Sequence, residues 1–340
     1  MTLPTRQILT LTSIALFALA TIPSASASFV DREEVRTFVE DIATRHNLDH
    51  ALLLDSLSRA RHEPRVISLI RPPSTPGVRS WQRYRARFLD KTRIEGGLAF
   101  WSEYAPILKM AEERYGVPAE VIVAIIGVET VYGRHTGNFE TLSALTTLAF
   151  DYPPRAELFR RELENLFLLA REQNRPPESY LGSYAGALGF PQFLPSSVRH
   201  YAVDFDADGK IDFDSSPLDA IGSVANYLHV HGWQTGAPVA VMARLGPETD
   251  PAPLVAAGIE PSLSPAVLSA AGIGSANGNM IDANATLVDL VTPGAATEYW
   301  LGYRNFYVIT RYNKSSFYAM SVFELAETLR QRRNEELAKR

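Results

Sequence analysis

An apolar stretch that ends on a single carboxylate, residues 121–133, constrains the fold of this chain more than any other part of its sequence. If the stretch is a helix, Glu129 shares a face with Ile122, Ile125 and Ile126. That face is apolar, so we expect it to be buried and Glu129 to be buried with it. Burial raises the pKa of a carboxyl group, which suits a general acid near neutral pH. A structural carboxylate paired with an arginine or a backbone amide is the alternative interpretation.

The composition is that of a globular protein without a broad basic surface. The chain has 340 residues, of which 46% are hydrophobic and 21% charged, and its net charge is -5. This charge argues against nucleic acid as a partner. Because the sequence contains no cysteine, disulfides, thiol nucleophiles and thiolate metal sites are excluded.

Residues 1–27 have the pattern of a secretory signal. Arg6 precedes a short apolar segment, residues 8–20, and the small residues 25–27 form a cleavage site that ends at Ala27. We expect cleavage near Ala27 and a soluble, exported mature protein. An uncleaved membrane anchor is the alternative, but the apolar segment is shorter than the roughly 20 residues that a span needs. No cysteine follows the cleavage site, so nothing supports a lipid anchor.

The remaining chain has mostly helical periodicity, followed by a shorter region of strand patterns. We expect the helix that carries Glu129 to stop at Gly133, and residues 64–76, which are rich in proline, to form a loop. Further helices are predicted at residues 30–45, 52–61, 94–115, 141–150, 155–171, 219–230 and 321–333. Strands are predicted at residues 239–245, 285–291, 297–303 and 306–312.

An acidic loop at residues 204–219 matches the front half of an EF-hand calcium site. Acidic residues alternate before Gly209, which stands at position six, whereas position twelve is Ser215 instead of the usual glutamate. We therefore expect an elongated loop that binds one structural calcium ion. A surface turn rich in aspartate is the alternative, although so many acids repel one another without a cation. The predicted ligands are Asp204, Asp206, Asp208, the carbonyl of Lys210, and Asp219, and contacts from Asp212 or Asp214 are left open.

Three separated motifs together resemble the lytic murein transglycosylase B family: ETVYG at residues 129–133, GALGFPQFLPSS at 186–197 and FYVITRYN at 306–313. The acidic loop and DAIGSVANY at residues 219–227 add to the resemblance, which runs from about Trp81 to Leu329. It implies a mainly α (α+β) fold with a lysozyme-like helical core, an additional helical domain and a small antiparallel β domain. The implied parts are a helical region at 28–95 that packs with residues 315–340, a catalytic core at 96–236, a β domain at 237–312 and a C-terminal helix at 313–340.

The resemblance also implies an activity and a location. Such enzymes act in the periplasm on peptidoglycan glycan strands, between N-acetylmuramic acid and N-acetylglucosamine, and form a 1,6-anhydro sugar without an organic cofactor. Glu129 takes the place of the single catalytic acid and base. Pro154 replaces one of two adjacent family arginines, which puts substrate contacts there in doubt. The implied substrate-binding residues are Tyr84, Arg155, Ser183, Gln192, Tyr227, Tyr312, Asn313 and Tyr318, and for the tyrosines simple packing is the alternative.

One carboxylate is fewer than a retaining glycosidase normally uses, since such an enzyme places two carboxyl groups about 5–5.5 Å apart. A single carboxyl group is sufficient if the 2-acetamido group of the substrate attacks C1 in place of the second one. A lysozyme-type hydrolase of the same fold remains an alternative, because water could take the place of the C6 hydroxyl. A non-catalytic wall-binding protein is the alternative from another class.

Overall fold

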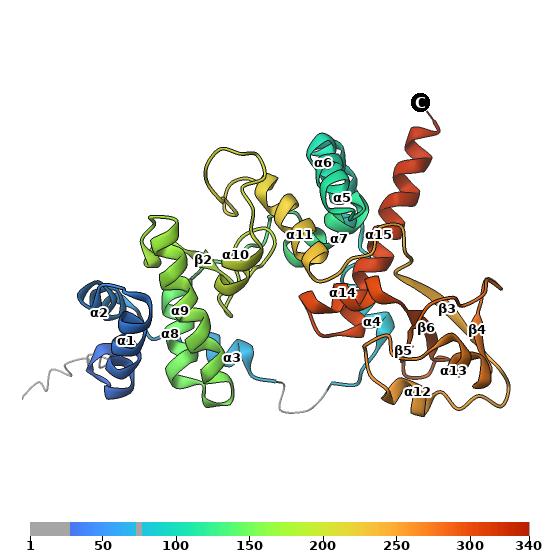
Figure 1. The fold of residues 1–340 in the computed structure, drawn as a ribbon, viewed down its shortest axis with the longest axis horizontal. Coiled ribbons are helices and arrows are strands. Elements are labelled where there is room, and N and C mark those ends of the chain that lie inside the picture. The colour runs from blue at the N-terminus through green and yellow to red at the C-terminus, as the bar shows by residue number, and fades with distance from the viewer. Residues whose placement is uncertain (1–27, 73–76, 340) are drawn as a thin grey trace, which may run out of the picture.

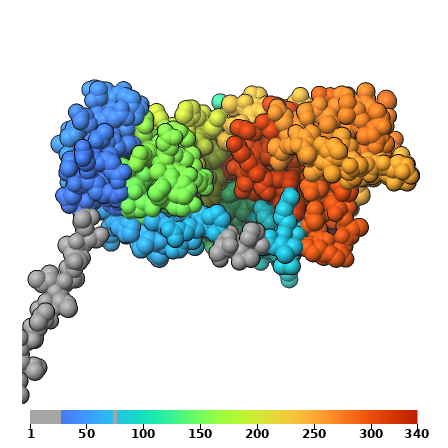
Figure 2. All heavy atoms as spheres, turned by 90° about the horizontal axis from the view of Figure 1, so that it is seen from below, coloured from blue at the N-terminus to red at the C-terminus, as the bar shows by residue number. Residues whose placement is uncertain are grey.

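The computed structural model describes residues 28–72 and 77–339, so the predicted signal segment lies outside the described residues. The molecule is elongated (Figure 1). Helices α1, α2, α8 and α9 form one end, the β-strands β3 to β6 form the other, and α7 lies between them. The short helices α3 and α4 lie along one long face of the molecule (Figure 2).

The described residues form a mainly helical fold with a small antiparallel sheet, as predicted, and a second sheet of two strands. The helices before the centre of the chain are α1 (Glu33–His46), α2 (His50–Arg59), α3 (Pro64–Ile70), α4 (Trp81–Arg85), α5 (Lys91–Glu103), α6 (Ala105–Tyr115) and α7 (Ala119–Thr130). Those that follow are α8 (Thr141–Asp151), α9 (Ala156–Glu172), α10 (Pro195–Tyr201), α11 (Leu218–Val230), α12 (Ala252–Ala256), α13 (Pro265–Ala270), α14 (Arg304–Tyr312) and α15 (Ser316–Leu337). Short 3-10 turns are η1 (Phe29–Asp31), η2 (Pro153–Arg155) and η3 (Pro177–Ser179).

Helix α7 is the centre of the hydrophobic core. Every residue from Val121 to Val128 is buried, on all sides of the helix and not on one face alone. A helix that is apolar all round is stable only inside the protein, and α7 is enclosed by α5, α6, α11 and α15. The C-terminal helix α15 also packs against α4, α5 and α14. Helices that precede and follow α7 in the chain, including the C-terminal helix, therefore meet around it.

The larger sheet has the strand order β4-β3-β6-β5, and all of its pairs are antiparallel. Its strands are β3 (Ala240–Leu245), β4 (Ile273–Ser275), β5 (Thr286–Leu290) and β6 (Glu298–Gly302), and a two-stranded sheet pairs β1 (Phe139–Glu140) with β2 (Leu181–Gly182). A small separate core centres on Leu268, Leu287 and Leu301. The backbone N–H of Trp81 donates to the carbonyl of Val291 at 2.8 Å, which attaches α4 to the end of β5.

The predicted strand at residues 306–312 is wrong, because this segment is helix α14. Its aromatic and β-branched residues favour a strand locally. Their burial instead follows helical spacing: Phe306, Ile309 and Thr310 are buried, while Tyr307 is half-buried and Arg311 exposed. Packing on α15 thus overrides the local preference, and Tyr312 becomes the last residue of a helix.

The prediction of a loop throughout residues 64–76 is wrong for its first part, which forms α3. Pro64 stands at the first helical position, where its missing N–H is not needed. The side chain of Glu63 caps the helix by accepting from the N–H of Arg65. Residues 73–76 lie outside the described residues.

Two other helical boundaries differ from the prediction. The single helix expected at residues 94–115 is divided at Tyr104 into α5 and α6, because Pro106 lacks the N–H that a continuous helix requires. Helix α15 begins at Ser316, five residues earlier than expected, since the hydroxyl of Ser315 accepts from the N–H of Tyr318 at 3.3 Å. The earlier start makes Tyr318 part of the helix that packs on α7.

Candidate active site

Glu129 is the penultimate residue of α7 and accepts a hydrogen bond at Oε1 from the hydroxyl of Tyr318, at 2.5 Å. Burial raises the pKa of Glu129 to about 7, and the hydrogen bond from Tyr318 lowers it by less. The residue nevertheless keeps part of its surface accessible. Its carboxyl group can therefore be protonated near neutral pH and still be reached by a ligand.

Tyr318 lies on the first turn of α15 and is buried, with 3% of its surface exposed. Burial and the neighbouring charge of Glu129 raise the pKa of its hydroxyl well above the ordinary value. Tyr318 therefore keeps its proton and acts as a hydrogen-bond donor to Glu129 throughout the neutral range.

Two more of the predicted tyrosines lie near the same carboxyl group. Burial and, after it, the charge of Glu129 raise the pKa of both Tyr84 and Tyr312. The ring of Tyr84 packs edge-on against Phe317 at 5.5 Å, and the hydroxyl of Tyr312 donates to the carbonyl of Pro191 at 2.6 Å. Helices α4, α14 and α15 thus each place one tyrosine around the end of α7.

A second carboxylate does not contribute to this environment. Within residues 28–72 and 77–339, the raised pKa of Glu129 has burial and the Tyr318 hydrogen bond as its causes, with no charged neighbour among them. A carboxyl pair sharing one site would instead repel and raise the pKa of one partner. The arrangement provides one proton-exchanging group in an apolar surrounding lined with tyrosine hydroxyls.

Gln192 is connected to the segment that follows Glu129. Its side-chain amide donates to the carbonyl of Thr136 at 3.0 Å and to that of Gly189 at 2.9 Å. Both partners are carbonyl oxygens, so the NH₂ group must face them and Oε1 must point the other way. Among the described residues, no group donates to this Oε1, which leaves it available to a ligand.

Asn313 and Ser183 have less direct relations to Glu129. Asn313 follows Tyr312 and is exposed, with no side-chain hydrogen bond to any described residue. The hydroxyl of Ser183 accepts from the N–H groups of Ala185 at 3.4 Å and Ala187 at 3.1 Å, within the loop that leads to Gln192. The serine therefore shapes its own turn.

No hydrogen bond among the described residues joins Tyr227 or Arg155 to Glu129. The hydroxyl of Tyr227 donates to the carbonyl of Arg311 at 2.7 Å, and its ring packs 4.9 Å from that of Tyr312. It supports Tyr312 from α11. Arg155 is exposed and lies over the ring of Phe159 at 5.4 Å, on a different part of the molecule's framework, η2 and α9.

Sequence reasoning missed the backbone groups that hold the site together. The hydroxyl of Thr130 can donate to the carbonyl of Phe190 at 3.0 Å or to that of Ile126 in its own helix at 3.2 Å, and the carbonyl of Pro191 accepts from Tyr312. Carbonyl oxygens occur in every residue, so no sequence signal marks the carbonyls of Phe190 and Pro191. Thr130 belongs to the ETVYG motif, but the motif does not indicate this contact.

The acidic loop brings together three of its predicted metal ligands. Carboxylate oxygens of Asp204, Asp206 and Asp219 lie within 4.8 Å of one another. Asp219, at the start of α11, accepts from the N–H groups of Phe205 at 2.7 Å and Asp212 at 2.8 Å. Three carboxylates at this separation repel unless a cation neutralises them, and hard oxygen donors suit calcium.

Asp208 is not part of this three-carboxylate group. Its Oδ1 accepts from the N–H of Lys210 at 2.8 Å. The loop is linked to the segment of Gln192, because the N–H of Phe190 donates to the carbonyl of Phe213 at 3.1 Å. The order of the acidic loop can therefore affect the position of Gln192.

Comparisons with known proteins agree on one family. The family model of the transglycosylase SLT domain matches residues 31–327. The chain is 41% identical over 312 residues to the membrane-bound lytic murein transglycosylase B of Escherichia coli (strain K12), which covers 88% of this chain and 84% of the relative.

Two solved structures extend the comparison to the fold. One is the Escherichia coli lytic transglycosylase Slt35 in complex with calcium, with a TM-score of 0.79, 41% identity and coverage of 90% of this chain and 95% of that one. The other is SltB3 from Pseudomonas aeruginosa in complex with NAG-anhNAM-pentapeptide, with a TM-score of 0.76, 32% identity and coverage of 90% and 80%. Separately, none of the helices in the described residues has the length and apolar character needed to cross a membrane.

Proposed function

This chain belongs to the family of the transglycosylase SLT domain and is a lytic murein transglycosylase, and from this premise we propose that Glu129 alone supplies both catalytic proton transfers. The observation that carries the proposal is the pKa of Glu129, raised to about 7 by burial without a charged partner. A group with this pKa is present in both protonation states near neutral pH, so it can donate a proton and then accept one.

In the first step, protonated Glu129 gives its proton to the glycosidic oxygen between N-acetylmuramic acid and N-acetylglucosamine. The bond from C1 to that oxygen breaks, and the carbonyl oxygen of the 2-acetamido group attacks C1 to form an oxazolinium ion. The apolar end of α7 favours the neutral acid before this step, because burial penalises the charged form. Tyr318 stabilises the carboxylate that results, since its hydroxyl donates to Oε1.

In the second step, the C6 hydroxyl of the muramic acid attacks C1 while the Glu129 carboxylate removes its proton. The oxazolinium ring opens, a 1,6-anhydro bond forms and Glu129 is protonated again. No second carboxylate is required, because the substrate provides both nucleophiles. The anhydro sugar in the ligand of the SltB3 neighbour, NAG-anhNAM-pentapeptide, supports this choice of product.

The polar groups around Glu129 would orient the sugar. We assign Oε1 of Gln192 to a hydroxyl or N–H of the glycan, because the two carbonyls that hold the amide leave this oxygen available. Asn313 and Tyr312 would orient the acetamido group, and Tyr84 would contact a sugar ring. Tyr227 would act through Tyr312. Ser183 and Arg155 remain predictions from the resemblance.

The acidic loop would hold one structural calcium ion. Asp204, Asp206 and Asp219 are the best-supported ligands because they share one site, with Asp208 and the carbonyl of Lys210 as further candidates. The calcium in the related Slt35 structure supports this assignment. The ion would neutralise the three carboxylates and order the loop, which is bonded to the Gln192 segment through Phe213.

The place of action would be the periplasm, where peptidoglycan glycan strands are the partner. The predicted signal at residues 1–27 supports export. We also propose that new structural parts of the chain begin at residues 96, 237 and 313: the catalytic core, the β domain and the C-terminal helix.

The decisive experiment digests purified peptidoglycan with the wild type and with Glu129→Gln, and measures product masses. The wild type should release 1,6-anhydro ends, and the variant should lose nearly all activity while its melting curve stays cooperative. Hydrated reducing ends from the wild type would identify a hydrolase instead. Near-full activity of the variant would show that another group carries the chemistry.

A further inference from the structure

The backbone immediately after Glu129 takes a conformation that its residues disfavour. Val131 has φ 52° and ψ 51°, Tyr132 has φ 59° and Gly133 has φ 85°, so three residues in succession are left-handed. Glycine adopts this region freely, whereas a β-branched residue such as valine is a genuine outlier there. The predicted glycine end of the helix at Gly133 is therefore wrong by two residues, because the left-handed turn starts at Val131.

This strain is concentrated near the proposed catalytic group. In the described parts of the chain, the non-glycine residues with positive φ are Val131, Tyr132, Gln192, Ala207 in the acidic loop and two asparagines. Asparagine tolerates the left-handed region, so the asparagines need no explanation. Of the other four, Val131 and Tyr132 follow Glu129 closely, and Gln192 belongs to the segment that is bonded to the turn through Phe190. Strain of this kind persists only where the surroundings enforce it, and it collects at functional sites.

The left-handed conformation of Tyr132 is maintained because its ring fits into a narrow space between α5 and α7. A Cβ atom on Gly97 of α5 would lie 2.5 Å from the Tyr132 hydroxyl, and one on Gly127 of α7 would lie 2.4 Å from it. The phenol therefore occupies space that any other residue at either position would take. Its hydroxyl donates to the carbonyl of Arg93 in α5 at 2.8 Å.

The side chain of Arg93 forms a second link between α5 and the end of α7. Its Nε donates to the carbonyl of Gly127 at 3.1 Å, and the same carbonyl accepts the N–H of Val131 at 3.1 Å. The turn is thus held to α5 through both the side chain of Tyr132 and the side chain of Arg93. Glu129 lies between Gly127 and Val131, inside the segment that this connection closes.

The opposite side of the turn is held by Thr130. Its hydroxyl lies 3.0 Å from the carbonyl of Phe190 and accepts the N–H of Gly133 at 3.0 Å. Glu129 is therefore flanked by ties to α5 on one side and to the Gln192 segment on the other. These ties hold the backbone on both sides of Glu129, which a frayed helix end would not do, and the hydrogen bond from Tyr318 holds its carboxyl group.

We propose that Tyr132 is a positioning residue for the reaction, holding the strained turn so that Glu129 points at the scissile bond and stays next to Tyr318. The proposal rests on the proposed role of Glu129. It predicts that the hydroxyl of Tyr132 affects catalysis without contacting substrate, because it acts through the backbone of residues 127–131. A misplacement of about 1 Å in a catalytic group can cost on the order of 10²-fold in rate.

The test compares Tyr132→Phe with Tyr180→Phe, a matched control. The Tyr180 hydroxyl donates to Oε1 of Gln173 at 2.7 Å, so each variant loses one phenolic hydrogen bond and keeps its ring. We expect Tyr132→Phe to lower kcat by about tenfold with little change in KM, and to move the alkaline limb of the pH-rate profile to lower pH as Glu129 becomes better solvated. Tyr180→Phe should lower the thermal midpoint similarly but leave kcat and the profile unchanged.

Equal melting losses with an unchanged kcat and pH profile for Tyr132→Phe would overturn the proposal, since a purely structural hydroxyl behaves in this way. If Tyr132→Phe fails to fold, Gly96→Ala presses on the same ring from α5, because its Cβ atom would lie 3.0 Å from Cδ2 of Tyr132, and it should reproduce the kinetic change. Adding Tyr132→Phe to Glu129→Gln separates the two proposals. A fully active Glu129→Gln contradicts the proposed function itself, whereas a measurable residual rate of Glu129→Gln that is the same with and without Tyr132→Phe supports the action of Tyr132 through Glu129.

Discussion

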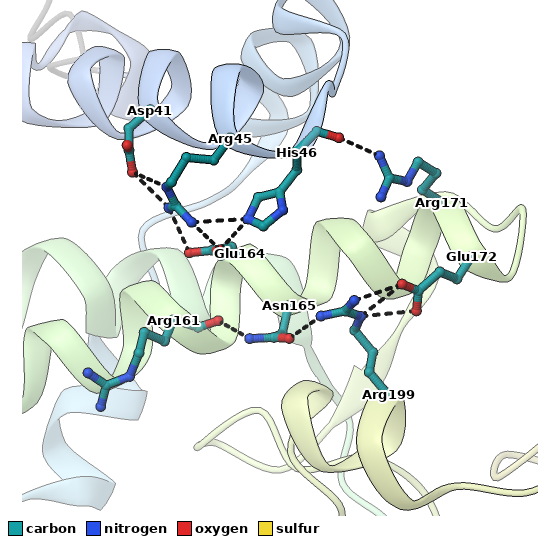
Figure 3. Close-up of polar contacts among 9 residues, drawn as sticks. All are labelled: Asp41, Arg45, His46, Arg161, Glu164, Asn165, Arg171, Glu172 and Arg199. Atoms are coloured by element: carbon teal, nitrogen blue, oxygen red, sulfur yellow. Dashed lines mark hydrogen bonds and ion pairs between the residues drawn. The ribbon is translucent and has the colours of Figure 1, made fainter.

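Two glutamates, Glu129 on α7 and Glu164 on α9, have opposite surroundings. Glu164 accepts from Arg45 Nη1 at 2.7 Å and Nη2 at 3.0 Å, and His46 Nε2 lies 2.5 Å away. Figure 3 shows these residues bridging α1 and α9. The hydrogen bonds from Arg45 lower the pKa of Glu164, while burial without a cation raises that of Glu129 to about 7.

The difference teaches that the environment assigns the role of a carboxyl group. Glu164 stays charged and holds α1 and α9 together. Glu172 joins α9 to α10, because it accepts from Arg199 in the same view (Figure 3). Such ion pairs at the surface contribute modestly to the free energy of unfolding. Glu129 has no cation to hold its charge, so its proton can leave and return in the neutral range. The carboxylates of the acidic loop are a third case, in which a bound cation would supply the missing positive charge.

The largest expected effect separates the two glutamates by activity. Glu129→Gln should lower the rate of peptidoglycan cleavage by about 10²–10⁴-fold or more, because it removes the proton-transfer group. Glu164→Gln should leave the rate within about twofold, since a paired carboxylate far from α7 carries no proton in the reaction. Turbidity loss and product masses for both variants check this. A strong loss of rate in a folded Glu164→Gln would break the comparison.

The second prediction concerns pH and stability. The pKa of Glu129 is higher in the folded protein, about 7, than its ordinary value of 4.5, so the folded state binds more protons and this group favours folding least at high pH. Its destabilising effect should grow as pH rises from about 4.5 to about 7, up to about 3 kcal/mol. Denaturant unfolding of the wild type and Glu129→Gln at pH 5 and pH 8 measures it.

The variant should gain stability relative to the wild type at pH 8, because a neutral amide avoids burying a charge. Cleavage activity of the wild type should fall above pH 7, where the acid loses its proton. A stability difference that does not change between pH 5 and pH 8 would mean that Glu129 titrates like an exposed carboxyl group.

The third prediction tests the acidic loop as the cation-dependent case. A chelator should lower the thermal midpoint of the wild type, since a ligand at 100 times its Kd stabilises by about 2.7 kcal/mol. Asp219→Asn should melt near the chelated value and respond less to added calcium. Melting curves with metal analysis check both. An unchanged melt, with no metal in the purified protein, would remove calcium from the proposal.

The smallest expected effect lies at Glu164. Glu164→Gln should destabilise the fold by about 1 kcal/mol near neutral pH, because the pair with Arg45 is partly solvated. Its lowered pKa gives the opposite sign to Glu129: the stabilisation is present above the unfolded pKa and disappears as pH falls through the folded one. The difference in unfolding free energy between the variant and the wild type should therefore be smaller at pH 3 than at pH 7.

Much of the site could be predicted from short patterns. The burial of residues 121–128 and the raised pKa of Glu129 follow from the apolar run around it. Site residues that come from distant parts of the chain were harder to predict. Tyr318 is 189 residues away from Glu129 in sequence, and its place followed only from the resemblance. Arg155 and Tyr227 follow from the same resemblance, and the structure shows no direct hydrogen bond from either to the carboxyl group among the described residues.

The sequence by itself determined the apolar helix around Glu129 and most of the other long helices, where the acids of the loop stand, and which family the chain resembles. These features depend on neighbours a few residues away, which the sequence displays directly. Only the tertiary structure decided that 306–312 is a helix, that α4, α14 and α15 converge on Glu129, and that Val131 and Tyr132 turn left-handed. Packing between distant elements decides these outcomes, because it can outweigh local preferences.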